Sequence, residues 1–409
     1  MKFVIDALHA LISGKIAIIK LCHFNDDGVL MLSLAKKASP KKNGDTMRHC
    51  STFALLFAAS GACLGQSGAV LYGIADAGIR YGKGLNAANA PTAGGTTPAV
   101  SSGINNTSRW GLRGQEDLGG GWQALYRLEG GLNLDTGSAA KSDKLFDRQA
   151  WVGLKSPLGS VTLGRQATLL ADAIAPVDPL GIRYASFNPN VNITGLSNTA
   201  FGRHSFGQQY GSSGYADNFY RLDNMVKASA SLGPVVARAA YSFGEVAGAT
   251  SPLSTWGGAL TYQQAGLAVS GAAMRFRNRD NRSLDAATVG AAYKVDTWQF
   301  KANLGVNRAD VGAGKSVRQG VISAGVGRQM APGVLLTTAY YKVRRSATGH
   351  VDDGFQRAFA YLEKTLSPRS TLYLESDYTL WQGDAAGVTG TRANDRKGMG
   401  LTLGLMHKF

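Results

Sequence analysis

The sequence predicts an all-β protein, a transmembrane antiparallel β-barrel of about sixteen strands with a long third extracellular loop folded into the lumen. Three observations support this fold class. The chain ends in a strand-like segment that stops on an aromatic residue, Phe409. Segments with two-residue periodicity follow one another, separated alternately by tight turns and longer polar connections. One connection, from Ala167 to about Asn218, breaks that rhythm.

The C-terminal segment alternates apolar and polar residues. Leu401, Leu403 and Leu405 fall at every second position, and the pattern is broken only at His407 before the chain reaches Phe409. A period of two indicates a strand with one apolar and one polar face. This fits the final strand of an outer-membrane barrel. An ordinary surface strand of a soluble β-protein has the same local pattern, so the rest of the chain has to decide.

Similar segments recur along the chain. In the clearest, Trp298 to Arg308, Trp298, Phe300 and Leu304 alternate with polar or small residues. Tight-turn chemistry such as Ser156-Pro157-Leu158-Gly159 separates successive pairs. An even count places both termini on the periplasmic side, and closure is required because an open sheet edge cannot face lipid. Counts of fourteen or eighteen stay open. The segments begin near residues 69, 108, 122, 147, 161, 219, 235, 254, 267, 284, 298, 317, 334, 355, 371 and 398.

The long connection is rich in Asp, Asn, Pro, Gly and Ser and contains no convincing spanning strand. A structureless loop of this length inside a compact domain is usually functional. In a barrel it has room to fold inward, where it would narrow the channel and set its size limit. The alternative is a long surface loop.

The N-terminal region reads as a processed segment. Residues 47–65 combine a basic start, an apolar core over Phe53–Ala59 and small residues, which is typical of a secretory signal peptide cleaved after Gly65 or Ala62. A lipoprotein site at Cys63 and a retained anchor are the other interpretations. Residues 1–46 have no evident structural role; translation starting at Met47 or Met31 would explain them, and a real extension is the alternative. The barrel is then 66–409, without cysteine.

Charge and residue types exclude several classes of function. Residues 66–409 hold 35 Lys and Arg against 23 Asp and Glu, a net charge of +12. These bases are spread over alternating segments rather than clustered in a stripe, which favours a lumen lining over nucleic-acid binding. An enzyme built on a barrel is disfavoured, because the sequence shows no candidate catalytic site. The histidines after residue 65 are only His204, His350 and His407, and no nucleophile or metal motif stands out. A soluble β-sandwich or adhesin would have polar outer faces. We expect no cofactor.

The alternation of residues along a strand (their parity) assigns some of these bases to the lumenal face. Their neighbours at odd spacing are apolar or aromatic, so these side chains are expected to face the lumen rather than lipid. They are Arg109, Arg113, Arg127, Arg238, Lys301 and Lys342. Arg148 is ambiguous because Trp151 would then face lipid or a neighbouring subunit.

Several local motifs, in this order, resemble the trimeric general-diffusion porins of Gram-negative bacteria, of the betaproteobacterial type. The resemblance covers essentially all of 66–409. It rests on Val70-Leu71-Tyr72-Gly73-Ile74-Ala75-Asp76-Ala77-Gly78, Ser108-Arg109-Trp110-Gly111-Leu112-Arg113-Gly114, Phe146-Asp147-Arg148-Gln149-Ala150-Trp151-Val152-Gly153-Leu154, Val161-Thr162-Leu163-Gly164-Arg165-Gln166, Arg221-Leu222-Asp223-Asn224 and the terminal Phe409.

The resemblance implies a sixteen-stranded homotrimeric barrel in the outer membrane, with a water-filled pore for ions and small hydrophilic solutes. It also implies contact with outer-membrane lipid, and recognition of the strand ending at Phe409 by the barrel-assembly machinery. The pore would be narrowed by acids on the third loop facing a basic wall. By local motif, the basic wall is Arg109, Arg148 and Arg221, with Arg165 at the base of the loop, and the loop acids are Asp178 and, nearby, Asp172.

One departure from the enterobacterial branch bears on selectivity. The loop lacks that branch's Pro-Glu-Phe-Gly-Gly stretch and reads Leu180-Gly181-Ile182-Arg183-Tyr184, which removes an acid and adds Arg183. Together with the basic surplus, this predicts a preference for anions. A substrate-specific channel of the same fold is the alternative.

Overall fold

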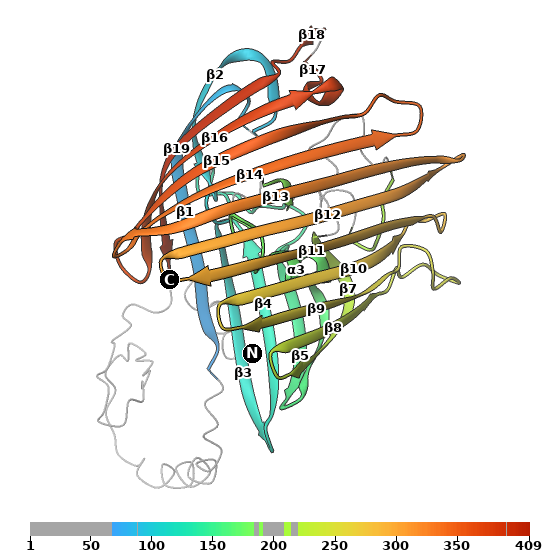
Figure 1. Cartoon of the computed structure of the whole chain (residues 1–409). Coiled ribbons are helices and arrows are strands. Elements are labelled where there is room, and N and C mark those ends of the chain that lie inside the picture. The colour runs from blue at the N-terminus through green and yellow to red at the C-terminus, as the bar shows by residue number, and fades with distance from the viewer. Residues whose placement is uncertain (1–67, 88, 184–187, 191–207, 214–219, 390) are drawn as a thin grey trace, which may run out of the picture. The chain divides into compact units, whose positions relative to one another are not determined.

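A single antiparallel sheet closes on itself to form a barrel (Figure 1). The computed structural model describes residues 68–409 except 88, 184–187, 191–207, 214–219 and 390. The expected extension 1–46 and signal peptide 47–65 lie outside the described residues and stay predictions. Seventeen strands belong to the sheet. They are β1 (Val70–Leu85), β2 (Pro91–Ser102), β3 (Arg109–Gly119), β4 (Trp122–Gly131), β5 (Gln149–Ser156), β6 (Gly159–Ala167), β7 (Arg221–Leu232), β8 (Val235–Ser242), β9 (Thr255–Gln264), β10 (Leu267–Arg277), β11 (Ser283–Val295), β12 (Trp298–Gly312), β13 (Lys315–Ala331), β14 (Val334–Ala347), β15 (Asp353–Thr365), β16 (Ser370–Gln382) and β19 (Lys397–Lys408).

Sixteen of these strands form the closed ring. From β3 to β16 each strand pairs with its neighbour in sequence, β16 pairs with β19, and β1 pairs with β19 at one edge and β3 at the other. Reciprocal backbone hydrogen bonds between Gly73 and Phe409 fasten the two ends of the described chain together. The predicted count of sixteen is confirmed for this ring, and each predicted start lies within two residues of an observed one. The strands run from 8 to 17 residues.

The seventeenth strand, β2, is an addition that the sequence analysis missed. It pairs with the second half of β1, while β3 pairs with the first half over Val70–Ile74. Its first eight residues, Pro91-Thr92-Ala93-Gly94-Gly95-Thr96-Thr97-Pro98, contain no apolar alternation that would show it. Because it lies within the first long connection, it does not change the number of strands in the ring.

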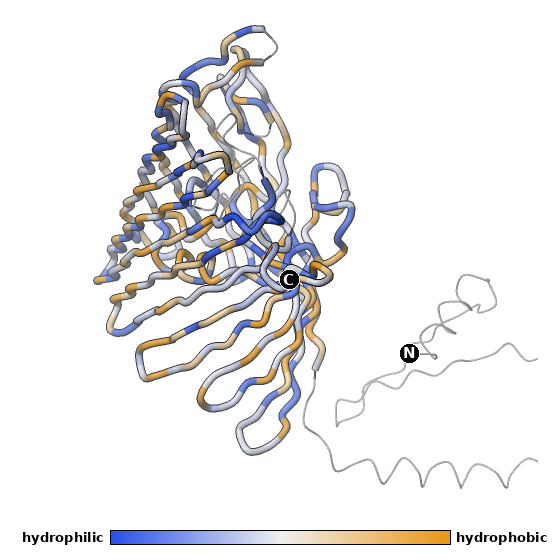
Figure 2. Tube along the Cα trace, turned by 90° about the vertical axis from the view of Figure 1, so that its right-hand side faces the viewer, coloured by the Kyte–Doolittle hydropathy of each residue, from blue (hydrophilic) through white to orange (hydrophobic). Residues whose placement is uncertain are grey.

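The two faces of the wall differ as a barrel in a membrane requires. On β19, Leu401, Leu403 and Leu405 are about half exposed, whereas Thr402 between them is fully buried. Figure 2 shows the same alternation of polar and apolar residues along the strands. Buried polar side chains gather on the inner face, and the exposed apolar side chains of the strands face outward. The inner face also carries two clusters of buried apolar side chains. Among the aromatic residues near strand ends, Trp122, Trp256, Trp298, Tyr340 and Phe409 face outward, whereas Tyr341 and Tyr373 are buried on the inner face.

The long connection between β6 and β7 contains one short helix, α3 (Leu169–Ile174), capped by the Thr168 side chain, which accepts from the amide of Ala171. The described residues after α3 lie against inward-facing positions of distant strands. Gly290 on β11 leaves room for Val177, and Gly325 on β13 leaves room for Pro179; a Cβ at either glycine would lie 2.6 Å from the loop side chain. The described part of this connection therefore lies against the lumenal face of the wall.

Candidate functional site

Strands β3 and β4 place a set of charged side chains on the lumenal face. Arg113 lies opposite Arg127 in the register, and Arg109 lies opposite Gly131. Because residues two apart share a face, Arg127 and Glu129 point the same way from β4. Tyr72 on β1 reaches the same place, since β1 pairs with β3 from Val70 to Ile74.

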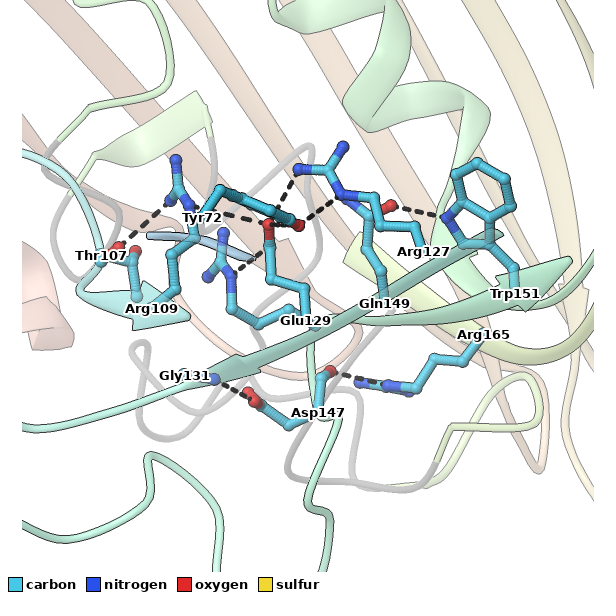
Figure 3. A network of polar contacts seen from close by, with 11 residues as sticks. Tyr72, Thr107, Arg109, Arg127, Glu129, Gly131, Asp147, Gln149, Trp151 and Arg165 are labelled. Carbon is cyan, nitrogen blue, oxygen red and sulfur yellow. Dashed lines mark hydrogen bonds and ion pairs between the residues drawn. The ribbon is translucent and has the colours of Figure 1, made fainter. Parts of the chain in front are cut away.

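Glu129 is the centre of this set (Figure 3). Its carboxylate is buried and accepts hydrogen bonds from Arg148 Nε at 2.7 Å, from an Arg127 Nη at 2.8 Å and from the Tyr72 hydroxyl at 2.8 Å. Arg109 Nε lies 3.8 Å away. Three guanidinium groups thus share one carboxylate, which leaves a surplus of positive charge facing the lumen. We call Arg109, Arg127, Glu129 and Arg148 the Glu129 cluster.

The position of Arg148 resolves the ambiguity in its parity. Strand β5 begins at Gln149, so Arg148 precedes the strand and does not follow its alternation. Trp151 is on the inner face, where its indole N–H donates to Gln149 Oε1 at 2.7 Å. Val152 and Leu154 are the exposed outward-facing residues. Arg148 and Trp151 are therefore compatible with one lumenal surface.

A second basic group adjoins the first. Arg165 donates to the backbone carbonyl of Asp147 and to Asp223 Oδ1, at 2.7 and 2.6 Å. Lys144 from the second long connection reaches the other oxygen of Asp223 at 2.6 Å. Arg221 lies over the ring of Tyr220 at 5.1 Å, and among the described residues it has no carboxylate within ion-pair distance. We call Lys144, Arg165, Arg221 and Asp223 the Asp223 cluster.

Lys141, in the same connection as Lys144, adds a titratable charge beside this cluster. Partial burial and the neighbouring Arg165 guanidinium lower the pKa of Lys141 to about 8. Burial disfavours the charged ammonium, and a nearby positive charge acts in the same direction. The charge of this side chain therefore changes close to neutral pH.

The acids predicted on the third loop are both engaged. Asp172 on α3 forms an ion pair with Lys227 of β7 at 2.8 Å. Asp178 is fully buried and accepts from the amide of Ile182, from the Asn188 and Asn190 side chains and from the Tyr341 hydroxyl, at 2.7 to 3.0 Å. Four neutral donors satisfy this carboxylate, which fastens the loop to β14.

Arg183 holds the same part of the loop to β15. It pairs with Glu363 at 2.6 Å, lies 4.6 Å from the centre of the Tyr361 ring and donates to the carbonyl of Leu180. Arg109 and Arg148 thus lie together at Glu129 on the lumenal face. Because Arg165 shares the parity of the outward-facing Leu163 on β6, the structure does not add Arg165 to this lumenal set. It places Asp178 and Arg183 against β13–β15 instead, and pairs Asp172 with β7.

Sequence reasoning missed several partners. Glu129 was not singled out, although it shares the parity of Arg127. Asp223 stood in a quoted motif without a role, and Lys144 and Lys227 carried no signal. One parity prediction was wrong: Lys342 faces outward, because Thr337, Ala339, Tyr341 and Val343 are the buried face of β14. Apolar and aromatic residues on both faces of that strand made its alternation uninformative.

Within the part of the chain that the structure describes, no helix is long and apolar enough to cross a membrane. The fold and the charged lumen together define a closed β-barrel with a polar, positively charged interior. A family model described as "Gram-negative porin" matches residues 51–384. The chain therefore belongs to the Gram-negative porin family, and it is an integral β-barrel of the outer membrane.

Individual relatives agree with this assignment. The chain is 35% identical over 156 residues to an outer membrane porin protein of Bordetella pertussis, covering 36% of this chain and 40% of the relative. The match thus spans less than half the length of this curated relative. Among solved structures, an anion-selective porin from Comamonas acidovorans matches with a TM-score of 0.67 at 22% identity, covering 84% of this chain and all of that chain. An outer membrane protein of Vibrio cholerae solved in a trimer form matches with a TM-score of 0.60 at 15% identity, covering 84% and 99%.

Proposed function

We propose that the barrel is a water-filled channel for passive diffusion of ions and small hydrophilic solutes, with a preference for anions. Its constriction would lie between the third loop and a basic wall made of Arg109, Arg148 and Arg221, with Arg165 at the base of the loop. Diffusion through such a channel requires no catalytic group and no cofactor. Selectivity would follow from the fixed charges that line the narrow part.

The observation that carries this proposal is the imbalance of charge in the lumen. Three arginines surround Glu129, and this one carboxylate cannot neutralise all three. The loop acids do not offset this surplus, because Asp172 is paired with Lys227 and Asp178 is buried among neutral donors. An anion entering the pore would meet cationic side chains that are not neutralised, whereas a cation would find no unpaired carboxylate among these residues.

Two further assignments belong to the same proposal. A homotrimer would bury part of the outward-facing apolar surface, and the Vibrio cholerae structure is described in a trimer form. Recognition by the barrel-assembly machinery would use β19, which exposes Leu401, Leu403, Leu405 and Phe409 on its outer face.

Reversal potentials across a planar bilayer under a KCl gradient test the ion preference. We expect a reversal potential whose sign indicates that chloride is more permeant than potassium. A clear preference for potassium would refute the proposed anion preference. Liposome swelling with neutral solutes of graded size then distinguishes a general channel from a substrate-specific one. A smooth decline of rate with size supports the general channel, whereas one solute entering much faster than its size predicts supports the alternative.

A further inference from the structure

The outward face of β12–β14 carries four bases next to the apolar surface of the barrel. Arg308, Arg318 and Arg344 are exposed, and Lys342 is partly so. Arg308 lies directly opposite Arg318, and Arg344 and Lys342 follow on the next strand, opposite Gly320 and Ile322. Among the described residues, none of the four has an ion pair or hydrogen bond.

This arrangement is unfavourable for the folded chain by itself. Like charges directly opposite one another on a sheet are destabilising, and a base on the lipid face costs free energy that rises toward the membrane midplane. The adjacent strands show the usual solution, because Arg275 on β10 pairs with Asp285 on β11 through two hydrogen bonds of 2.6 and 2.9 Å. Arg308 lies opposite Asp285 in the register, but both oxygens of that carboxylate accept from Arg275. Arg318, between Arg308 and Ser346, has no acid beside it in the row.

A groove lies beneath these bases. Its volume is about 740 Å³, and its lining combines Arg318, Lys342 and Arg344 with one acid, Asp352, and with small residues such as Ala287 and Gly320. Leu304 and Ile322 line it toward the apolar band and are half exposed or more. A second hollow of about 480 Å³ shares Val306 and Arg318 with it and reaches Arg308 and Trp256. The site is therefore amphipathic, with a basic rim and an apolar floor.

The groove is at the end of the barrel opposite to the start of β1 and the end of β19. Arg308 and Arg318 flank the turn that joins β12 to β13, whereas β1 begins and β19 ends at the other rim. This is the end with the long connections, which in outer-membrane barrels face outward. The exposed Trp256 ring at the second hollow fits a membrane interface, where aromatic side chains are enriched.

We propose that this groove binds a lipid of the outer leaflet whose headgroup carries phosphate. The phosphates would contact Arg318, Lys342 and Arg344, and an acyl chain would lie along Leu304 and Ile322. Guanidinium groups bind phosphate through paired, charge-assisted hydrogen bonds. Binding would satisfy these three bases and cover the apolar floor in one step. The inference rests on the membrane location of the barrel and not on the proposed constriction, because these side chains face away from the lumen.

The test compares two double variants of the full-length, detergent-purified protein. Arg318→Gln with Arg344→Gln removes two bases from the groove. The matched control, Arg328→Gln with Lys364→Gln, removes two exposed outward-facing bases from the opposite rim. Retention of diphosphoryl lipid A is measured by native mass spectrometry in mixed micelles, with phosphatidylcholine as the neutral lipid and inorganic phosphate as competitor.

The groove variant lacks two bases, each of which attracts an anionic membrane surface. We therefore expect it to bind lipid A about thirtyfold more weakly, and the control to bind like wild type. The conservative Arg318→Lys with Arg344→Lys should retain most binding, which separates lost charge from misfolding. Single-channel conductance of all variants should stay unchanged, so failure of this proposal is distinguishable from failure of the channel proposal.

Three results would overturn it. Equal lipid A retention by both double variants would show that the groove is not the site. Inorganic phosphate competing as strongly as lipid would show that the site binds the free anion. Loss of oligomers in the groove variant alone would make the groove a contact between copies of the chain.

Discussion

Glu129 and Asp178 are both buried carboxylates on the lumenal side of the barrel, but their surroundings have opposite consequences. Glu129 is surrounded by Arg109, Arg127 and Arg148, so its charge is more than compensated. Asp178 accepts from one backbone amide, two side-chain amides and a hydroxyl, all neutral. One carboxylate organises a surplus of positive charge toward the pore, and the other is withdrawn from solvent.

This difference separates selectivity from attachment. A carboxylate held by cations sets the charge that a permeating ion meets. A carboxylate held by neutral dipoles contributes structure, because four donors from the loop and from β14 converge on it. In this barrel the third loop is therefore fastened by its acid, whereas the wall is charged by its arginines. Substitutions at the two sites should change different properties.

The largest effect is expected at Asp178. Asp178→Ala removes the acceptor shared by the Asn188 and Asn190 amides and the Tyr341 hydroxyl, although each amide keeps a second acceptor. The lost hydrogen bonds should weaken the attachment of the loop by about 3 kcal/mol. We expect faster proteolytic cleavage within the loop and noisier open-channel currents, with little change in reversal potential. Limited proteolysis and single-channel recording measure these.

Tyr341→Phe is the matched control for that prediction. It removes one of the four donors to Asp178 and keeps the ring, so its effect should be smaller, about 1.5 kcal/mol. If Asp178→Ala shifted selectivity strongly while the loop stayed resistant to protease, the distinction between the two carboxylates would be wrong.

Arg148 and Arg221 should control selectivity. Arg148→Ala removes one cation from the Glu129 cluster, and Arg221→Ala removes a base that has no carboxylate partner among the described residues. A unit charge about 4 Å from an ion in water is worth roughly 1 kcal/mol. Each substitution should therefore lower the chloride-to-potassium permeability ratio, by up to about fivefold. Reversal potentials in a KCl gradient measure the ratio.

Glu129→Gln is the opposite change at the same site. It removes the carboxylate and leaves the three arginines, so the permeability ratio should move toward chloride. A shift toward potassium in this variant, or unchanged selectivity in both arginine variants, would place the selective charges elsewhere in the lumen.

Much of the strand pattern was visible in the sequence, because a closed wall between lipid and water imposes a period of two. Strand starts such as those at Trp122, Val235 and Trp298 were predicted directly. Alternation does not identify a strand or its faces where the pattern is weak or ambiguous. Strand β2 lacks apolar alternation, and β14 has apolar or aromatic residues on both faces, which led to the wrong face for Lys342.

The candidate site was predictable in its composition and much less in its contacts. Motifs identified Arg109 and Arg148, which the structure places at one carboxylate, and Arg165, which pairs with Asp223 instead. The role of Asp178 depends on Tyr341, which is 163 residues away in sequence, and no local pattern encodes that contact. Glu129 was accessible in principle, because it shares a face with Arg127, but its importance follows only once Arg148 and Tyr72 are placed beside it.

The smallest effect is expected from pH, and it tests whether the second long connection contributes to the basic wall. Partial burial and Arg165 lower the pKa of Lys141 to about 8, so this side chain is mostly charged at pH 7 and mostly neutral at pH 9. Raising the pH should therefore remove close to one positive charge beside the Asp223 cluster and reduce the preference for chloride, by less than an arginine substitution does. Reversal potentials measured between pH 7 and pH 9 should show the change in wild type and lose it in Lys141→Met. A pH dependence that survives in Lys141→Met would assign the titration to another group, and the second connection would then have no part in selectivity.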